Sequence, residues 1–112
     1  MIKMYGIPNC NTIKKAKDAL AAKGLDFEFH NYKKDGIDAG TLESWCSQVG
    51  WKTLLNQRGT TWRKLSPDDK EVINQDKAIQ LMCVYPSMIK RPVLVVGDKI
   101  IVGFDEAVYA EL

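Results

Sequence analysis

The beginning of the chain restricts the fold most, because strand-like and helix-like patterns follow one another there with little sequence between them. Residues 2–6 (IKMYG) form a short apolar run that ends before Pro8, which predicts a strand. Apolar residues at helical spacing over residues 11–23, with Gly24 in a C-terminal cap position, predict a helix. Residues 25–30 (LDFEFH) alternate apolar and polar side chains, as a half-buried strand does. Strand, helix and strand in this order predict parallel pairing through a right-handed crossover.

The end of the chain has a different pattern. Residues 92–96 (PVLVV) are an unbroken apolar run, which is typical of a strand covered on both faces. The Gly-Asp pair after them can form a two-residue hairpin turn, so residues 99–103 (KIIVG) are expected to return as the next strand. Asp105 is then expected to cap a last helix over residues 106–112.

The middle of the chain is predicted to be helical but irregular. Helices are expected over residues 41–49, 66–73 and 76–85, from apolar spacing and from capping residues. A loop is expected over residues 33–40 and a break over residues 58–61. No internal repeat or linker is visible, so we expect a single domain that spans residues 1–112.

Composition narrows the class of protein. The chain has 112 residues, of which 46% are hydrophobic and 27% charged, and its net charge is +2. These values indicate a globular protein and give no reason to expect a nucleic-acid or membrane partner. No apolar run approaches the ~20 residues of a membrane span, and no signal peptide is visible at the start. We therefore expect a cytoplasmic protein, and a monomer.

Cys10, Cys46 and Cys83 are the three cysteines, and their long spacings favour free thiols over a disulfide framework. They form no CxxC pair, and the only histidine, His30, cannot build a His-rich metal site. No metal site is therefore expected. Cys46 and Cys83 lie within apolar helical patterns and are interpreted as core residues.

Cys10 differs because it lies between the first predicted strand and the first predicted helix. A helix N-terminus favours negative charge, so it lowers the pKa of a thiol and favours the reactive thiolate. Lys14 and Lys15, one turn further on, add positive potential. The sequence therefore indicates a nucleophile, with a small buried residue as the alternative.

Two further segments carry groups that suit anion binding. Arg91 precedes Pro92, and an arginine at the edge of a site can hold an oxyanion or a carboxylate. Residues 54–65 (LLNQRGTTWRKL) combine cationic and hydroxyl side chains around Arg58. The alternatives are a solvated surface charge for Arg91 and an ordinary basic loop for residues 54–65.

The three motifs YGIPNCNTIKKA, LLNQRGTTWRKL and PSMIKRPVLV, in this order, resemble the ArsC-like (arsenate reductase/Spx) family and in particular its YffB branch. The resemblance covers nearly the whole chain. It implies an α/β, thioredoxin-like (glutaredoxin-like) fold: a four-stranded mixed sheet with a helical insertion, about residues 39–88, after the second strand. It also implies that Pro92 is a cis-proline that faces Cys10.

The resemblance assigns roles to individual residues. Cys10 matches the catalytic nucleophile, and Arg91 matches an arginine that helps to hold an oxyanion in arsenate reductases. The substrate-binding residues that it implies are Asn9, Asn11, Thr12, Lys14, Arg58 and Pro92. The register at Arg58 differs, because Asn56 falls at the nominally matching position. Gly103 and Phe104 replace a third arginine, and Gly6 replaces a histidine.

The resemblance to the YffB branch, together with the position of Cys10, implies a glutathione-dependent thiol–disulfide reductase with a single nucleophilic cysteine. Glutathione is the expected cosubstrate, with no tightly bound cofactor, and the partner substrate is a small-molecule or protein disulfide or another oxidised group. The alternatives are a glutathione- and glutaredoxin-coupled arsenate reductase, and an Spx-like regulator that binds RNA polymerase without catalysis. The Spx redox switch uses a CxxC pair, and Ile13 occupies the second cysteine position here.

Overall fold

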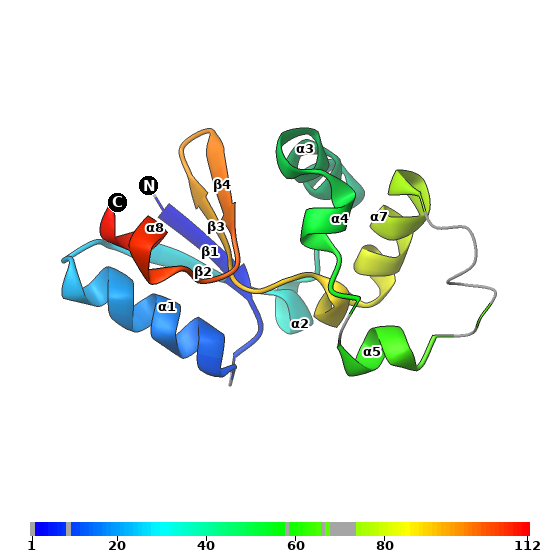
Figure 1. Cartoon of the computed structure of the whole chain (residues 1–112), viewed down its shortest axis with the longest axis horizontal. Helices are drawn as coiled ribbons and strands as arrows, with labels where there is room; N and C mark the ends of the chain where they lie inside the picture. Colours follow the sequence, from blue (N-terminus) through cyan, green and yellow to red (C-terminus); the bar gives the residue numbers. More distant parts are fainter. Residues whose placement is uncertain (1, 9, 58, 66, 68–73) are drawn as a thin grey trace. The chain divides into compact units, whose positions relative to one another are not determined.

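The computed structural model describes residues 2–8, 10–57, 59–65, 67 and 74–112. The chain divides into two compact units. The first unit combines the residues up to Asp35 with Arg91–Leu112, and the second is Gly36–Lys90. The first unit contains all the strands of the sheet (Figure 1). The expectation of a single domain over residues 1–112 remains a prediction.

The sheet of the first unit has four strands in the order β2-β1-β3-β4. The strands are β1 (Ile2–Gly6), β2 (Phe27–Asn31), β3 (Val93–Val96) and β4 (Lys99–Val102). β2 is parallel to β1, while β3 is antiparallel to both β1 and β4. Both predicted pairings are confirmed: the parallel pairing at the start of the chain and the hairpin near its end. The result is the mixed four-stranded sheet of the expected thioredoxin-like fold.

Helix α1 (Asn11–Ala22) connects the two parallel strands. It ends one residue before the expected end at residue 23, and Gly24 follows with a φ of 68°, a left-handed conformation that glycine accepts at no steric cost. The N–H of Leu25 then donates to the carbonyl of Leu20 at 3.0 Å and closes the last turn. Helix α8 (Glu106–Ala110) begins at the expected cap, where Asp105 Oδ1 accepts hydrogen bonds from two backbone N–H groups.

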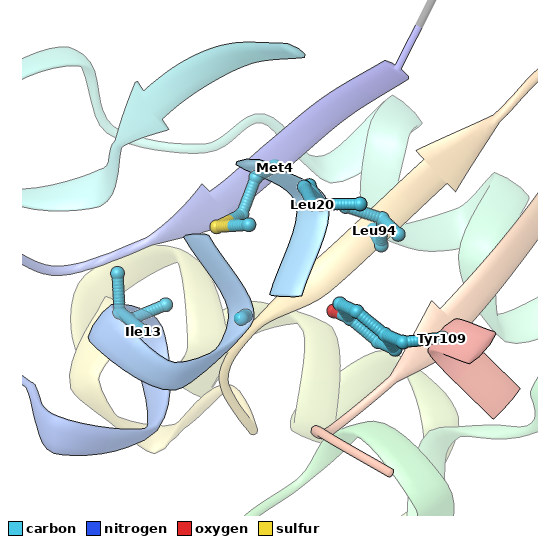
Figure 2. Close-up of a cluster of buried hydrophobic side chains, with 6 residues drawn as sticks. Met4, Ile13, Leu20, Leu94 and Tyr109 are labelled. Atoms are coloured by element: carbon cyan, nitrogen blue, oxygen red, sulfur yellow. The ribbon is translucent and has the colours of Figure 1, made fainter. Parts of the chain in front are cut away.

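The core of the first unit lies between the sheet and helices α1 and α8. Figure 2 shows side chains from these elements pointing toward one another. The fully buried members of this core are Met4, Ile13, Ala16, Leu20, Leu94 and Tyr109. Burial of each large apolar side chain stabilises the fold by about 1.5–3 kcal/mol. Because Ile13 belongs to this cluster, the first turn of α1, and with it Cys10, is fixed to the core.

The second unit contains only helices and one isolated antiparallel bridge, Leu55 to Ile89, among its described residues. Its helices are α3 (Ala39–Val49), α4 (Trp51–Leu54), α5 (Thr60–Arg63), α7 (Gln75–Val84) and the 3₁₀ helix η1 (Pro86–Met88). The backbone N–H of Lys90 donates to the carbonyl of Leu54 at 2.8 Å and supports the bridge. The unit follows β2 in the sequence, which confirms the helical insertion after the second strand.

Several predicted boundaries were wrong. The loop expected over residues 33–40 begins within a short helix, α2 (Tyr32–Asp35), and α3 starts at Ala39 because Asp38 Oδ1 accepts from the N–H of Thr41 at 2.7 Å. The break expected over residues 58–61 is helical from Thr60 onward. Strand β2 begins at Phe27 rather than at residue 25.

The helix expected over residues 66–73 lies almost entirely outside the described residues and stays a prediction. Within the described part of the chain, no helix is long and apolar enough to cross a membrane.

Candidate functional site

Cys10 is the N-cap residue of α1, directly after the loop that leaves β1. Its backbone is extended, with φ −101° and ψ 129°, and its carbonyl accepts the first helical hydrogen bond from the N–H of Lys14 at 3.0 Å. The thiol is free and half-buried. This position places the sulfur beside backbone N–H groups that have no acceptor within the helix. The predicted location at a helix N-terminus is therefore confirmed.

The surroundings of Cys10 lower the pKa of its thiol below the ordinary value of 9.0. Burial acts in the opposite direction and is the largest single influence. It is outweighed by the backbone N–H groups of Ile13 and Thr12, by the positive charge of Arg91 and by the Thr12 hydroxyl, which all favour the thiolate. Neutral pH therefore leaves Cys10 with a larger thiolate fraction than an ordinary cysteine has.

The other two thiols have the opposite tendency. Burial raises the pKa of Cys46, which is 5% exposed within α3, and the charge of Glu43 adds to the effect. Burial also raises the pKa of Cys83, with a further contribution from Asp38. Cys46 is a core residue as expected. Cys83 is half-buried, so the interpretation as a core residue was only partly right for it.

The register of the sheet places Arg91 and Pro92 near Cys10. Val93 lies opposite Tyr5 in the antiparallel pair of β3 and β1, so the residues just before Val93 lie at the end of β1 that leads to Cys10. The peptide bond between Arg91 and Pro92 is cis, as the resemblance implied. Pro92 is buried and its carbonyl accepts from the N–H of Gly103 at 2.8 Å. Arg91 is half-buried, with its charge acting on the Cys10 thiol.

Tyr32 is a buried neighbour of Arg91 that no pattern in the sequence indicated. It is the first residue of α2, it is 1% exposed, and its hydroxyl has no hydrogen-bond partner among the residues that the structure describes. Burial raises the pKa of Tyr32 strongly, Tyr5 raises it further, and the charge of Arg91 lowers it. Its ring lies 6.1 Å from that of Tyr5, centroid to centroid. Tyr32 therefore stays a neutral phenol under physiological conditions.

A groove of about 480 Å³ opens beside Cys10. It is lined by Pro8, Cys10, Asn11, Ile13, Lys14 and Lys17. Lys17 was not among the predicted site residues. Its ammonium lies 4.1 Å from the centroid of the Phe29 ring in β2. Helical spacing could have identified it, because Lys14 and Lys17 are one turn apart and therefore lie on the same face of α1.

The predicted site residues are thus distributed as follows. Cys10, Asn11, Thr12 and Lys14 lie in the first turns of α1, and Arg91 and Pro92 lie just before β3. Asn9 and Arg58 lie outside the described residues. The roles of all eight remain predictions. Among the described residues, no group of three or more His, Cys, Asp or Glu side chains could hold a metal ion.

Two departures from the arsenate reductase pattern have structural reasons. A Cβ atom at Gly6 would collide with Cδ1 of Ile13, which is 2% exposed, so any larger residue there would require this buried side chain to shift. Phe104 packs against the core, with its ring centroid 4.9 Å from that of Tyr109 in an edge arrangement. Both positions therefore serve packing in this chain.

Known proteins with similar structures place this geometry in a family. The sequence profile of the ArsC family matches residues 5–112. A solved structure of the protein named YffB (PA3664) is 46% identical, with a TM-score of 0.96, over 99% of this chain and 97% of that one. The solution structure of an arsenate reductase (ArsC) related protein from Brucella melitensis is also 46% identical, with a TM-score of 0.78, over 98% of this chain and 92% of that one.

Relatives known by sequence agree with this placement. An uncharacterized protein of Haemophilus influenzae is 38% identical over 109 residues, which cover 97% of this chain and 96% of the relative. The global transcriptional regulator Spx of Streptococcus pyogenes is 27% identical over 108 residues, which cover 95% of this chain and 80% of Spx. The chain therefore belongs to the ArsC family and is related to YffB and to arsenate reductases.

Proposed function

We propose that this protein is a glutathione-dependent thiol–disulfide reductase in which Cys10 is the sole nucleophile. The observation that carries the proposal is that Cys10 alone, of the three cysteines, has a lowered thiol pKa. A thiolate is the attacking form in thiol–disulfide exchange. The groove of about 480 Å³ beside Cys10 provides room for a substrate.

In the first step the Cys10 thiolate attacks one sulfur of a mixed disulfide between glutathione and a substrate thiol. The S–S bond of the substrate breaks as the new bond between Cys10 and the glutathione sulfur forms. The substrate leaves as a thiolate and takes a proton from water. Cys10 is oxidised from a thiolate to a disulfide with glutathione as the substrate thiol is reduced and released, so the total number of disulfides does not change.

In the second step the thiolate of a second glutathione attacks the glutathione sulfur that is bound to Cys10. The products are oxidised glutathione and the regenerated Cys10 thiolate, so two electrons pass from glutathione to the substrate. The resolving thiol comes from another molecule, because Ile13 stands where the second cysteine of a CxxC pair would be and is part of the buried core.

Arg91 and Thr12 support both steps through the charge of Cys10. The Arg91 guanidinium and the Thr12 hydroxyl stabilise the thiolate before attack. They stabilise it again when Cys10 becomes the leaving group of the second step, since a thiol of lower pKa leaves faster. One set of contacts therefore serves attack and release.

The test compares Cys10→Ser with the double variant Cys46→Ala/Cys83→Ala. Glutathione-dependent reduction of a small mixed disulfide should fall at least about 100-fold in Cys10→Ser and remain near wild type in the double variant. Mass spectrometry after treatment with oxidised glutathione should find the adduct on Cys10. Unchanged turnover in Cys10→Ser would refute the proposal.

Arsenate reduction is a second candidate, which the relationship to an arsenate reductase related protein supports. In that reaction Cys10 would attack the arsenic centre. The packing at Gly6 and Phe104 disfavours it, because neither position offers the histidine or arginine of arsenate reductases. Arsenate-dependent turnover in the presence of glutathione and glutaredoxin would establish it.

The third candidate function is regulatory rather than enzymatic, and the relationship to Spx supports it. The Spx redox switch cannot form here, because Ile13 replaces the second cysteine. A role of this kind would not depend on Cys10. Recovery of RNA polymerase subunits with equal yield by wild type and by Cys10→Ser, together with absent turnover, would favour it over the reductase.

A further inference from the structure

Two grooves of similar volume open on the two sides of α1, and their charges differ. The groove beside Cys10, about 480 Å³, is lined by Lys14 and Lys17, and none of its described lining residues is acidic. The groove between α1 and α8, about 500 Å³, is lined by Lys15, Asp18, Lys23 and Glu106. Two cations and two anions make the second groove nearly neutral, whereas the Cys10 groove has two positive charges that no lining acid offsets.

Lys17 is held in a defined position within the Cys10 groove. Its ammonium lies 4.1 Å from the centroid of the Phe29 ring, which is a cation–π contact, and its side chain is half-buried. Phe29 is itself fixed, because it pairs with Met4 in the sheet and packs against the buried core. A lysine that is already ordered loses less side-chain entropy when it binds an anion than a freely moving lysine does.

Lys14 is exposed, and it lies one helical turn closer to Cys10 than Lys17 does. The two side chains therefore form a line of positive charge that leads from the reactive sulfur along the helix. The Arg91 charge already acts on the sulfur itself and favours the thiolate. Lys14 and Lys17 lie further along the helix, so they can interact with the part of a substrate that extends away from the reacting bond.

We propose that Lys17, assisted by Lys14, selects disulfide and thiol substrates that have a carboxylate beyond the reacting sulfur. The proposal rests on the attack by Cys10 described above and adds a specificity-determining residue to it. The Cys10 thiolate displaces a thiolate from the disulfide, as in the first step of the reductase cycle. Lys17 takes no part in bond making, and its contribution is to bind the anionic end of the substrate while the exchange occurs.

The experiment measures how fast Cys10 reacts with three disulfide reagents of different charge, in the Cys46→Ala/Cys83→Ala background. The reagents are dianionic 5,5′-dithiobis(2-nitrobenzoate), neutral 2,2′-dithiodipyridine and dicationic cystamine. The ratio of the dianion rate to the neutral rate reports charge selection. A change in the Cys10 pKa alters both rates together and leaves this ratio nearly unchanged.

Lys17→Gln should lower this ratio about fivefold at low salt, because it removes one charge within a few ångströms of the bound carboxylate. Lys15→Gln is the matched control, since it removes an equal charge from the same helix but lines the other groove. Its ratio should change less than about twofold. The cystamine rate should rise in Lys17→Gln, which a general loss of structure would not produce.

Phe29→Leu tests the positioning of Lys17 while both charges are kept. It should lower the ratio about twofold, since the ammonium then loses the aromatic surface that holds it. Equal ratios for Lys17→Gln and Lys15→Gln would overturn the proposal. A lowered ratio in Lys17→Gln without any glutathione turnover in wild type would exclude the reductase and still support the anion-selective groove.

Discussion

Cys10 and Cys83 are both half-buried free thiols, and they lie at opposite ends of their helices. Cys10 is the N-cap of α1, where N–H groups point outward, and Arg91 adds a positive charge. Cys83 is in the last turn of α7, where carbonyl groups point outward, and the charge of Asp38 acts on it. The thiol pKa is lowered at Cys10 and raised at Cys83.

The difference shows that exposure alone does not decide which cysteine is reactive in this protein. Burial raises the pKa of both thiols, so their neighbours separate them: backbone N–H groups and the Arg91 charge lower the pKa of Cys10, whereas the Asp38 charge raises that of Cys83. Helix termini carry partial charges of opposite sign, positive at the N-terminus and negative at the C-terminus. A cysteine at the start of a helix next to an arginine therefore has a larger thiolate fraction than one at the end of a helix next to a carboxylate.

The largest expected effect is the ratio of alkylation rates at these two thiols. With iodoacetamide at pH 7, Cys10 should react at least about thirtyfold faster than Cys83, since only the thiolate reacts. As pH rises, Cys10 should reach half of its maximal rate below pH 9.0 and Cys83 above it, in line with the directions of their pKa shifts. Peptide mass spectrometry of partially labelled protein measures both rates in one sample. Equal rates for the two thiols would contradict the comparison.

Removal of Arg91 should give the next largest effect. Arg91→Met removes the positive charge that favours the thiolate, so the Cys10 pKa rises and its alkylation at pH 7 slows about five- to tenfold. The same variant should leave the rate at Cys83 unchanged, which makes Cys83 an internal standard. Arg91→Lys retains the charge, so it should slow the alkylation of Cys10 by less than about half as much as Arg91→Met does. Identical slowing at both thiols would indicate a structural change and would count against the electrostatic role of Arg91.

Local patterns predicted the parts of the fold that local interactions determine. The limits of α1 follow from Cys10 at its start and Gly24 after its end, and the hairpin of β3 and β4 follows from two strands around a Gly-Asp pair. The short helices α2, α4 and α5 were missed because a single turn shows no periodicity.

The candidate site could be predicted only in part from local sequence. Cys10 and its helix N-terminus are adjacent in sequence, so position favoured Cys10 as the candidate nucleophile and left a small buried residue as the alternative. The approach of Arg91 depends on the antiparallel register of β3 against β1, which the family resemblance supplied and local patterns did not. The sequence did not indicate Tyr32, because an isolated tyrosine after a strand has many ordinary roles. The structure identified it through its buried hydroxyl.

The smallest expected effect comes from the charge beside Cys83. Asp38→Asn removes the negative charge that raises the Cys83 pKa, so alkylation of Cys83 at pH 7 should become about two- to threefold faster while Cys10 is unaffected. The substitution keeps the cap of α3, since an asparagine carbonyl can accept the hydrogen bond that Asp38 Oδ1 takes from the N–H of Thr41. An unchanged thermal midpoint would verify this. Because backbone N–H groups and the Arg91 charge still favour the thiolate at Cys10 and not at Cys83, the Cys83 rate should remain well below that of Cys10. If Cys83 in this variant reacts as fast as Cys10, the position of each thiol at its helix terminus does not contribute to the difference in rate. The charge of Asp38 alone would then account for that difference.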